Sequence, residues 1–273
     1  MASKEPVKVL TIGGSDSGGA AGVQADLKTW TGLGVYGMSA LTAVTAQNSL
    51  TVTAVYFLPP AFVNQQIETV LADYGATAVK TGFLGQSAII AAVAAALIEF
   101  DLPHILIDPV LVTHKGAAMF ATAVLDAYRL NLLPLATLLT PNLPELALLA
   151  GVEMGSLGSV NGLRTAVTKL HDLGTKNILV TGWREGDRVV DWFAQDGEIR
   201  PLPMPYIETE NRHGSGDTLS AAICAFLAKG DSMLTAIQKA QKVTQTALQN
   251  AYNWQLGQGH GPLNHFDLQI PSS

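Results

Sequence analysis

The chain has 273 residues, of which 48% are hydrophobic and 14% are charged, and its formal net charge is −6. This length and composition suffice for one large hydrophobic core, so we expect a single domain over residues 1–273. The acidic balance provides no basic surface for nucleic acid or anionic membranes, and the longest notable apolar run, 88–98, is too short to cross a bilayer.

Short strand-like segments alternate with longer helical segments along the chain. The first part predicts strands at 7–14, 39–48, 51–59, 78–85 and 104–110, and helices at 22–34, 61–74 and 87–100. The second part predicts a helix at 123–134, a strand at 135–142, a helix at 162–174, a strand at 177–183, a hairpin over 187–203, and closing helices at 217–229 and about 231–251. Apolar strands alternating with helices favour an α/β fold with a mostly parallel sheet covered on both faces. Ligands of such sheets bind beyond the carboxyl ends of the strands, so the residues after each strand are the informative ones.

A glycine-rich segment, GGSDSGGAAG at 13–22, follows the first predicted strand. Glycines there permit close backbone approach, so the loop could bind an anion or a flat ligand before the next helix, or be a simple turn. Residues 32–37 match G-x-G-x-x-G, but they follow a helix and precede a strand, which is the reverse of the order in a dinucleotide site. The sequence also contains no P-loop motif.

Polar residues follow three further strands. Asp108 and Glu145 stand at or shortly after strand ends, where two carboxylates could hold a hydrated Mg²⁺; alternatively each could cap a turn or a helix. Gln47 ends an apolar strand, and its amide could pair with a heterocycle that carries an adjacent donor and acceptor, or with a loop backbone.

The segment HGSGD, residues 213–217, leads into an apolar helix. The backbone amides of Gly214, Ser215 and Gly216 stand where a helix N-terminus favours negative charge, as on a transferring phosphoryl group. Asp217 could accept the proton of an attacking hydroxyl, or it could cap the helix.

Cys224, in the same helix, is the only cysteine, so no disulfide framework can form within the chain. The first ten residues show no apolar signal core. Both observations fit a reducing environment, and we expect a cytoplasmic protein.

Seven segments in order resemble motifs of the hydroxymethylpyrimidine/phosphomethylpyrimidine kinases of thiamine biosynthesis, in the ribokinase-like superfamily. They are TIGGSDSGGAAGVQADLKT, VYGMSALTAVTAQNS, VKTGFLGQ, IDPVLV, TPNLPEL, RHGSGDTLSAA and GHGPLNHF. The resemblance implies a three-layer α/β/α sandwich, commonly a homodimer, that transfers the ATP γ-phosphate to 4-amino-5-hydroxymethyl-2-methylpyrimidine and then phosphorylates the monophosphate.

The resemblance also assigns roles to individual residues. The pyrimidine would contact Gly14, Asp26, Gln47, Phe83 and Val110. Asp108 and Glu145 would organise Mg²⁺ and the phosphates, and residues 214–216 would form the anion hole beside Asp217. Asn142, Thr181 and Gly182 would border the nucleotide, ATP.

Three positions depart from the family pattern. Asp217 replaces a common cysteine, and its reference pKa of about 3.9 against about 8.5 for cysteine favours a general base. Phe83 replaces methionine, which changes the surface that packs on the ring. Thr181 replaces a common lysine, for which Lys115 or Arg212 could compensate.

Two alternatives stay open at this point. Relatives of this architecture phosphorylate pyridoxal, pyridoxamine or pyridoxine, and pyridine rings also carry donors and acceptors that Gln47 could read. The chain could also be a non-catalytic pyrimidine-binding module, although a pure binder needs no base such as Asp217.

Overall fold

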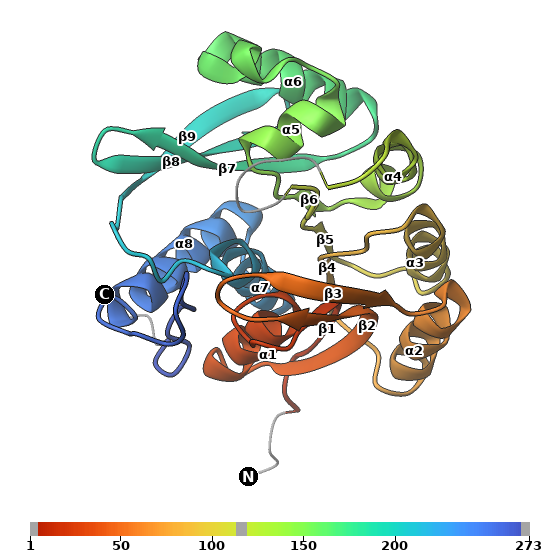
Figure 1. Cartoon of the computed structure of the whole chain (residues 1–273). Helices are drawn as coiled ribbons and strands as arrows, with labels where there is room; N and C mark the ends of the chain where they lie inside the picture. Colours follow the sequence, from red (N-terminus) through yellow and green to blue (C-terminus); the bar gives the residue numbers. More distant parts are fainter. Residues whose placement is uncertain (1–4, 113–118, 269–273) are drawn as a thin grey trace.

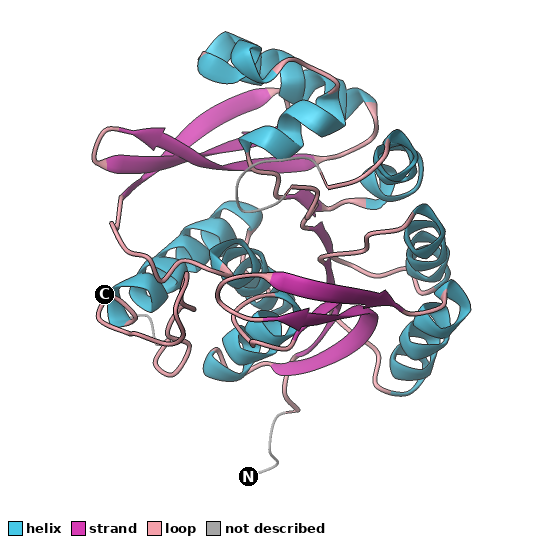
Figure 2. Cartoon of the chain, viewed as in Figure 1, coloured by secondary structure: helices cyan, strands magenta, loops and turns pink. Residues whose placement is uncertain are grey.

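The computed structural model describes residues 5–112 and 119–268, and a nine-stranded sheet runs through this part of the chain (Figures 1 and 2). The strands are β1 (Lys8–Asp16), β2 (Tyr36–Gln47), β3 (Val52–Phe57), β4 (Ala78–Thr81), β5 (Ile105–Ile107), β6 (Leu138–Leu139), β7 (Asn177–Glu185), β8 (Arg188–Gln195) and β9 (Glu198–Pro205). Their order in the sheet is β3-β2-β1-β4-β5-β6-β7-β8-β9. The six strands from β2 to β7 in that order are parallel, and β3, β8 and β9 pair antiparallel with their neighbours. The expected mostly parallel sheet is confirmed.

Helices cover both faces of the sheet (Figure 1). They are α1 (Gly22–Gly32), α2 (Pro60–Asp73), α3 (Ser87–Glu99), α4 (Thr122–Ala127), α5 (Leu143–Ala150), α6 (Val160–Asp172), α7 (Ser215–Ala228) and α8 (Met233–Asn250). Alternate strand residues enter opposite cores: Val9 packs with α1, α7 and α8, whereas Leu10 packs with the apolar residues of α2 to α6. This arrangement is the three-layer α/β/α sandwich of the ribokinase-like fold. In the described ranges, no helix is both long and apolar enough to cross a membrane.

The predicted helix at 123–134 is interrupted in the structure. After α4 the chain forms a π turn over Tyr128–Leu132 and a 3-10 turn over Leu133–Leu135. Pro134 lacks an amide hydrogen and its ring excludes a carbonyl of the preceding turn, so a regular α-helix cannot continue through it. The strands predicted at 104–110 and 135–142 also shorten, to β5 and β6, which leaves Asp108 and Asn142 in the loops beyond the sheet.

Candidate active site

The HGSGD segment forms a tight turn into α7. Gly214 adopts a left-handed conformation with φ of 86°, and a Cβ there would lie 1.9 Å from the carbonyl oxygen of Ala20, so only glycine fits. In the described part of the chain no side chain caps the N-terminus of α7. The amide of Ser215 donates to the carbonyl oxygen of Arg212 at 3.2 Å, whereas the amides of Gly216 and Asp217 have no partner among the described residues and are available to a ligand.

Asp217 does not cap α7. Its Oδ1 accepts a hydrogen bond from Lys80 Nζ at 3.1 Å, and its Oδ2 accepts one from the amide of Gly22 at 3.1 Å. The carboxylate thus joins the first turn of α7 to β4 and to the start of α1. The capping interpretation of Asp217 is therefore wrong, and its role as a proton acceptor stays a prediction.

Lys80 connects three of the aspartates at the site, and it was not among the residues selected from the sequence. It is fully buried on β4, and its Nζ lies 2.6 Å from Asp26 Oδ1, 3.1 Å from Asp217 Oδ1 and 3.7 Å from Asp108 Oδ2. Burial by itself lowers the pKa of Lys80, but the charges of the three aspartates outweigh burial and raise it. The ammonium stays protonated and binds the cluster together. The one sequence signal was a lysine inside an apolar strand, AVKT, which needs a buried partner.

Asp26 lies beneath the site. Its side chain is 1% exposed, and its Oδ2 accepts a 2.6 Å hydrogen bond from Thr11 Oγ1 while Oδ1 faces Lys80. Burial raises the pKa of Asp26, and Lys80 opposes that rise. The described contacts of this carboxylate are with the protein, so its contact with a pyrimidine stays a prediction.

Asp108 and Glu145 lie close enough for their charges to interact. Asp108 accepts a 2.7 Å hydrogen bond from Ser220, and Glu145 accepts from the amides of Asn142 and Leu111. Burial, and then the charge of Asp108, raise the pKa of Glu145 to about 8. Glu145 also completes a capping box with Asn142 at the start of α5, so the capping interpretation of this residue is correct.

These two carboxylates are the expected donors for Mg²⁺, and the described residues contain no cluster of three or more metal-binding side chains. Mg²⁺ is usually held by one or two carboxylates together with substrate phosphates and water, so two suffice. A cation beside them would also stabilise the ionised carboxylates that burial disfavours.

Of the residues expected around the pyrimidine, Gly14 and Gln47 lie at the ends of β1 and β2, Phe83 and Val110 follow β4 and β5, and Asp26 lies on α1. A Cβ on Gly14 would lie 3.0 Å from the ring of Phe83, so a larger residue at position 14 would crowd this ring. Phe83 stacks on Phe57 with ring centres 5.9 Å apart and contacts Phe120 at 5.7 Å. Val110 follows Asp108 and is half-buried.

Gln47 lies at the end of β2 and is half-buried. Thr45 Oγ1 donates to its Oε1 at 3.2 Å, and its Nε2 lies 3.0 Å from His213 Nε2. The side-chain amide of Gln47 is therefore orientated by two neighbours. One of them, His213, directly precedes the expected anion hole at residues 214–216, which is called the anion loop below. His213 is a second residue that the sequence analysis missed.

The residues expected to contact the nucleotide lie after β6 and within β7. Asn142 and Thr181 form an isolated parallel bridge, and the amide of Thr181 donates to Pro141 at 2.9 Å. Gly182 has φ of 80° within a register shift of β7, and its amide donates to Asp191 Oδ1 at 3.0 Å. Of the two cations considered for Thr181, Arg212 is exposed beside the anion loop, and Lys115 lies outside the described residues.

The glycine-rich loop has an internal anion. The carboxylate of Asp16 accepts hydrogen bonds from the amides of Gly18, Ala20 and Ala21 at 2.8 to 2.9 Å. The loop is thus organised by Asp16, which the sequence analysis did not select, and these three amides already have a partner.

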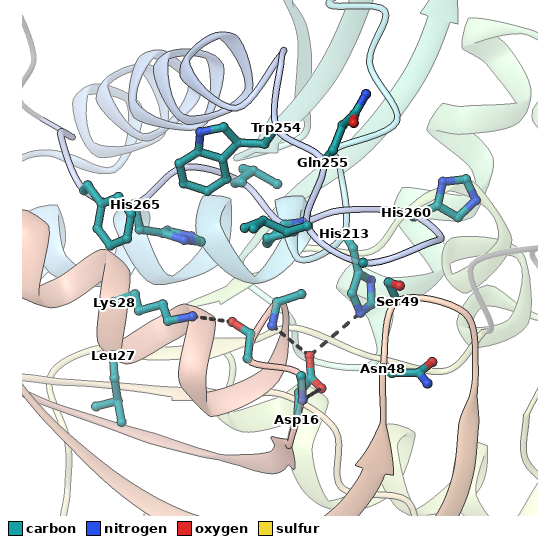
Figure 3. Close-up of a pocket in the computed structure, with 18 of the residues that line it drawn as sticks. Asp16, Leu27, Lys28, Asn48, Ser49, His213, Trp254, Gln255, His260 and His265 are labelled. Atoms are coloured by element: carbon teal, nitrogen blue, oxygen red, sulfur yellow. Dashed lines mark hydrogen bonds and ion pairs between the residues drawn. The ribbon is translucent and has the colours of Figure 1, made fainter.

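A cleft of about 1400 Å³ adjoins the site, between this loop, α1 and the C-terminal segment 253–266 (Figure 3). Asp16 and His213 line it, with 3.9 Å between His213 Nε2 and Asp16 Oδ2. Lys80, Gln47, Phe83 and Asp217 do not line it. This cleft is therefore adjacent to the predicted chemistry, where Asp16 and His213 line it.

Comparisons with known proteins identify the family of the chain. The family model for phosphomethylpyrimidine kinase matches residues 16–264. The hydroxymethylpyrimidine/phosphomethylpyrimidine kinase of Bacillus subtilis is 38% identical over 95% of this chain and 94% of its own length. The thiamine biosynthesis bifunctional protein ThiED of Geobacter sulfurreducens is 42% identical over 94% of this chain, which spans only 52% of that longer relative. An ADP complex of Bacillus subtilis pyridoxal kinase superimposes with a TM-score of 0.88 at 35% identity, covering 97% of this chain and 99% of that one. The chain belongs to the phosphomethylpyrimidine kinase family.

Proposed function

We propose that this kinase transfers the γ-phosphoryl group of ATP to the hydroxymethyl group of 4-amino-5-hydroxymethyl-2-methylpyrimidine, and then phosphorylates the monophosphate to the diphosphate. The family match supports the reaction class and the pyrimidine substrate. The observation that carries the proposal is the placement of Asp217 beside an uncapped helix N-terminus, within a cluster of strand-end residues. A base next to an anion hole is what phosphoryl transfer to an alcohol needs.

In this mechanism Asp217 accepts the proton of the substrate hydroxyl as the oxygen attacks the γ-phosphorus. Both of its oxygens have one protein donor each, which leaves lone pairs for the hydroxyl. The amides at residues 214–217 stabilise the equatorial oxygens of the transferring group. Asp108 and Glu145 would hold Mg²⁺, which would neutralise charge on the ATP phosphates when bound.

The amide of Gln47 reads the aminopyrimidine edge in this proposal, with Oε1 accepting from the amino group and Nε2 donating to a ring nitrogen. Phe83 and Val110 pack on the ring, with Gly14 and Asp26 bordering it. Asn142, Thr181 and Gly182 border the nucleotide. We also propose that residues 1–273 act as one kinase domain in the cytoplasm, and that the protein is a homodimer.

A second candidate function is the phosphorylation of pyridoxal. The overall likeness to the Bacillus subtilis pyridoxal kinase favours it. One assay separates the two: Mg-ATP is supplied with either the hydroxymethylpyrimidine or pyridoxal, and the products are resolved by mass. We expect pyrimidine mono- and diphosphate, whereas pyridoxal phosphate as the sole product would establish the second function.

The role of Asp217 has a direct test. Asp217→Asn should lower kcat about 10²- to 10⁴-fold, because the amide cannot accept the hydroxyl proton, while the Kd values for ATP and pyrimidine change little. Asp73→Asn, at an exposed aspartate near the end of α2, serves as the matched control and should leave kcat unchanged. Wild-type turnover in Asp217→Asn would contradict the general-base role.

A further inference from the structure

We propose that Lys80 is a positioning residue for phosphoryl transfer, which holds the carboxylate of Asp217 in the orientation that accepts the substrate proton. This inference rests on the proposed role of Asp217. Lys80 belongs to β4 in the interior of the sheet, whereas Asp217 belongs to α7, so the contact joins the proposed base to the central sheet.

The geometry gives Lys80 a fixed position from which to act. The ammonium lies 2.6 Å from Asp26, which is itself held by Thr11 on β1. From there a second ammonium hydrogen can point to Asp217 Oδ1 at 3.1 Å, while the Gly22 amide binds Oδ2. Two donors from different elements thus restrict rotation of the Asp217 carboxylate.

The third carboxylate of the cluster is held less closely. Asp108 Oδ2 is 3.7 Å from Lys80 and takes its 2.7 Å hydrogen bond from Ser220 instead. One cation therefore faces three carboxylates, two of them at hydrogen-bonding distance. The excess negative charge beside Asp108 is consistent with that residue serving a bound cation.

Stability alone is a poor explanation for this arrangement. The attraction within a buried ion pair barely offsets the free energy needed to remove both charges from water. Proteins in which apolar residues of similar volume replace such a pair are often equally stable or more stable. Lys80 is fully buried, and one ammonium cannot neutralise three carboxylates. A role in orientating Asp217 accounts for the buried position of Lys80 and for its close contacts with Asp26 and Asp217.

The test is a double-mutant cycle between Lys80→Met and Asp217→Asn, carried out in an Asp26→Asn background. The background is needed because Lys80→Met alone would leave the buried Asp26 carboxylate without its cation. Asp26→Asn is present in all four proteins, so its own effect on substrate binding cancels from the cycle. Circular dichroism and thermal unfolding establish that each protein is folded, and calorimetry gives the Kd values for ATP and pyrimidine.

We expect Lys80→Met to lower kcat about 10- to 100-fold when Asp217 is present, with Kd values little changed, because misplacing a catalytic group costs rate rather than binding. Combined with Asp217→Asn, the same substitution should change kcat less than about threefold, since the group it positions is already lost. Equal losses in both backgrounds, or no loss in the first, would overturn the proposal. An ineffective Asp217→Asn would instead overturn the proposed base, so the two failures are distinguishable.

Two further variants complete the experiment. Thr175→Val removes a buried hydrogen bond to the carbonyl oxygen of Leu133 without touching Lys80, Asp26 or Asp217, and it should lower thermal stability while kcat stays within about threefold of wild type. A loss of kcat as large as that of Lys80→Met would assign the effect to general core damage and overturn the proposal. If Lys80→Met does not fold, Lys80→Gln replaces it under the same criteria, because its amide is one bond shorter and cannot reach Asp217 from the same backbone position.

Discussion

At the scale of single residues, the amide that we propose to read the pyrimidine is already orientated by the protein itself. Gln47 is bound by Thr45 and faces His213, so its carbonyl and amino ends have defined directions before any ligand arrives. His213 in turn lies directly before the anion loop and donates its backbone amide to Gly261 at 3.1 Å. The proposed pyrimidine contact and the proposed phosphoryl site are thereby joined through one histidine.

We expect Gln47→Leu to raise KM for the pyrimidine about 10-fold or more with a smaller change in kcat, because leucine provides neither the acceptor nor the donor. Steady-state kinetics at saturating ATP measure this. Gln65→Leu, at an exposed position of α2, is the matched control and should leave KM unchanged. A sharp fall in the thermal midpoint of Gln47→Leu, with KM unaltered, would show that the residue is mainly structural.

At the scale of elements, the segment after α8 packs against the first turn of α7. His265 Nε2 lies 2.9 Å from Thr218 Oγ1, and Leu263 and Leu268 are buried beside it. His265 is 7% exposed, and burial, with a smaller contribution from Lys28, lowers its pKa to about 4. The C-terminal segment therefore docks with a neutral histidine.

This docking makes stability depend on pH. Between about pH 6.5 and pH 4 the unfolded chain binds a proton at His265 that the folded chain does not, so this residue destabilises the fold as pH falls. As pH falls from 7 to 4.5, the free energy of unfolding should decrease by on the order of 1–3 kcal/mol less in His265→Gln than in wild type, because glutamine takes up no proton. Urea denaturation at the two pH values would measure this difference. An identical pH dependence in both proteins would contradict the buried neutral state.

At the scale of the whole molecule, the two edges of the sheet differ. β9 carries Pro201, Pro203 and Pro205 at every second position, and prolines remove donors and discourage further strand pairing. β3, at the other edge, carries no proline and exposes Val52, Val55 and Tyr56, the last at 71%. An exposed apolar edge of this kind favours association, and we place the proposed homodimer contact there.

Tyr56→Lys should weaken the dimer, because a charge would be buried against the apolar edge of the partner. Light scattering after size-exclusion chromatography should show a shift from dimer mass toward monomer mass. Tyr252→Lys, at a tyrosine of similar exposure after α8, should leave the mass unchanged. A wild-type protein that elutes at monomer mass would contradict the dimer proposal.

The sequence by itself determined the features that are local in the chain. Apolar periodicity and glycine positions predicted most elements and the mostly parallel sheet, and the ordered motifs predicted the family that the comparisons confirm. The rule that parallel strands present their carboxyl ends at one edge was enough to select Asp108, and the glycine turn before an apolar helix was enough to select Asp217. Tertiary structure decided what depends on convergence: Lys80 among three aspartates, Asp16 inside its own loop, and His213 beside Gln47. The contacts of Lys80 and His213 join residues far apart in the chain, and those of Asp16 depend on how its loop folds back. Apolar periodicity predicts which face of a helix or strand is buried, but it does not predict which side chain of another element will contact that face.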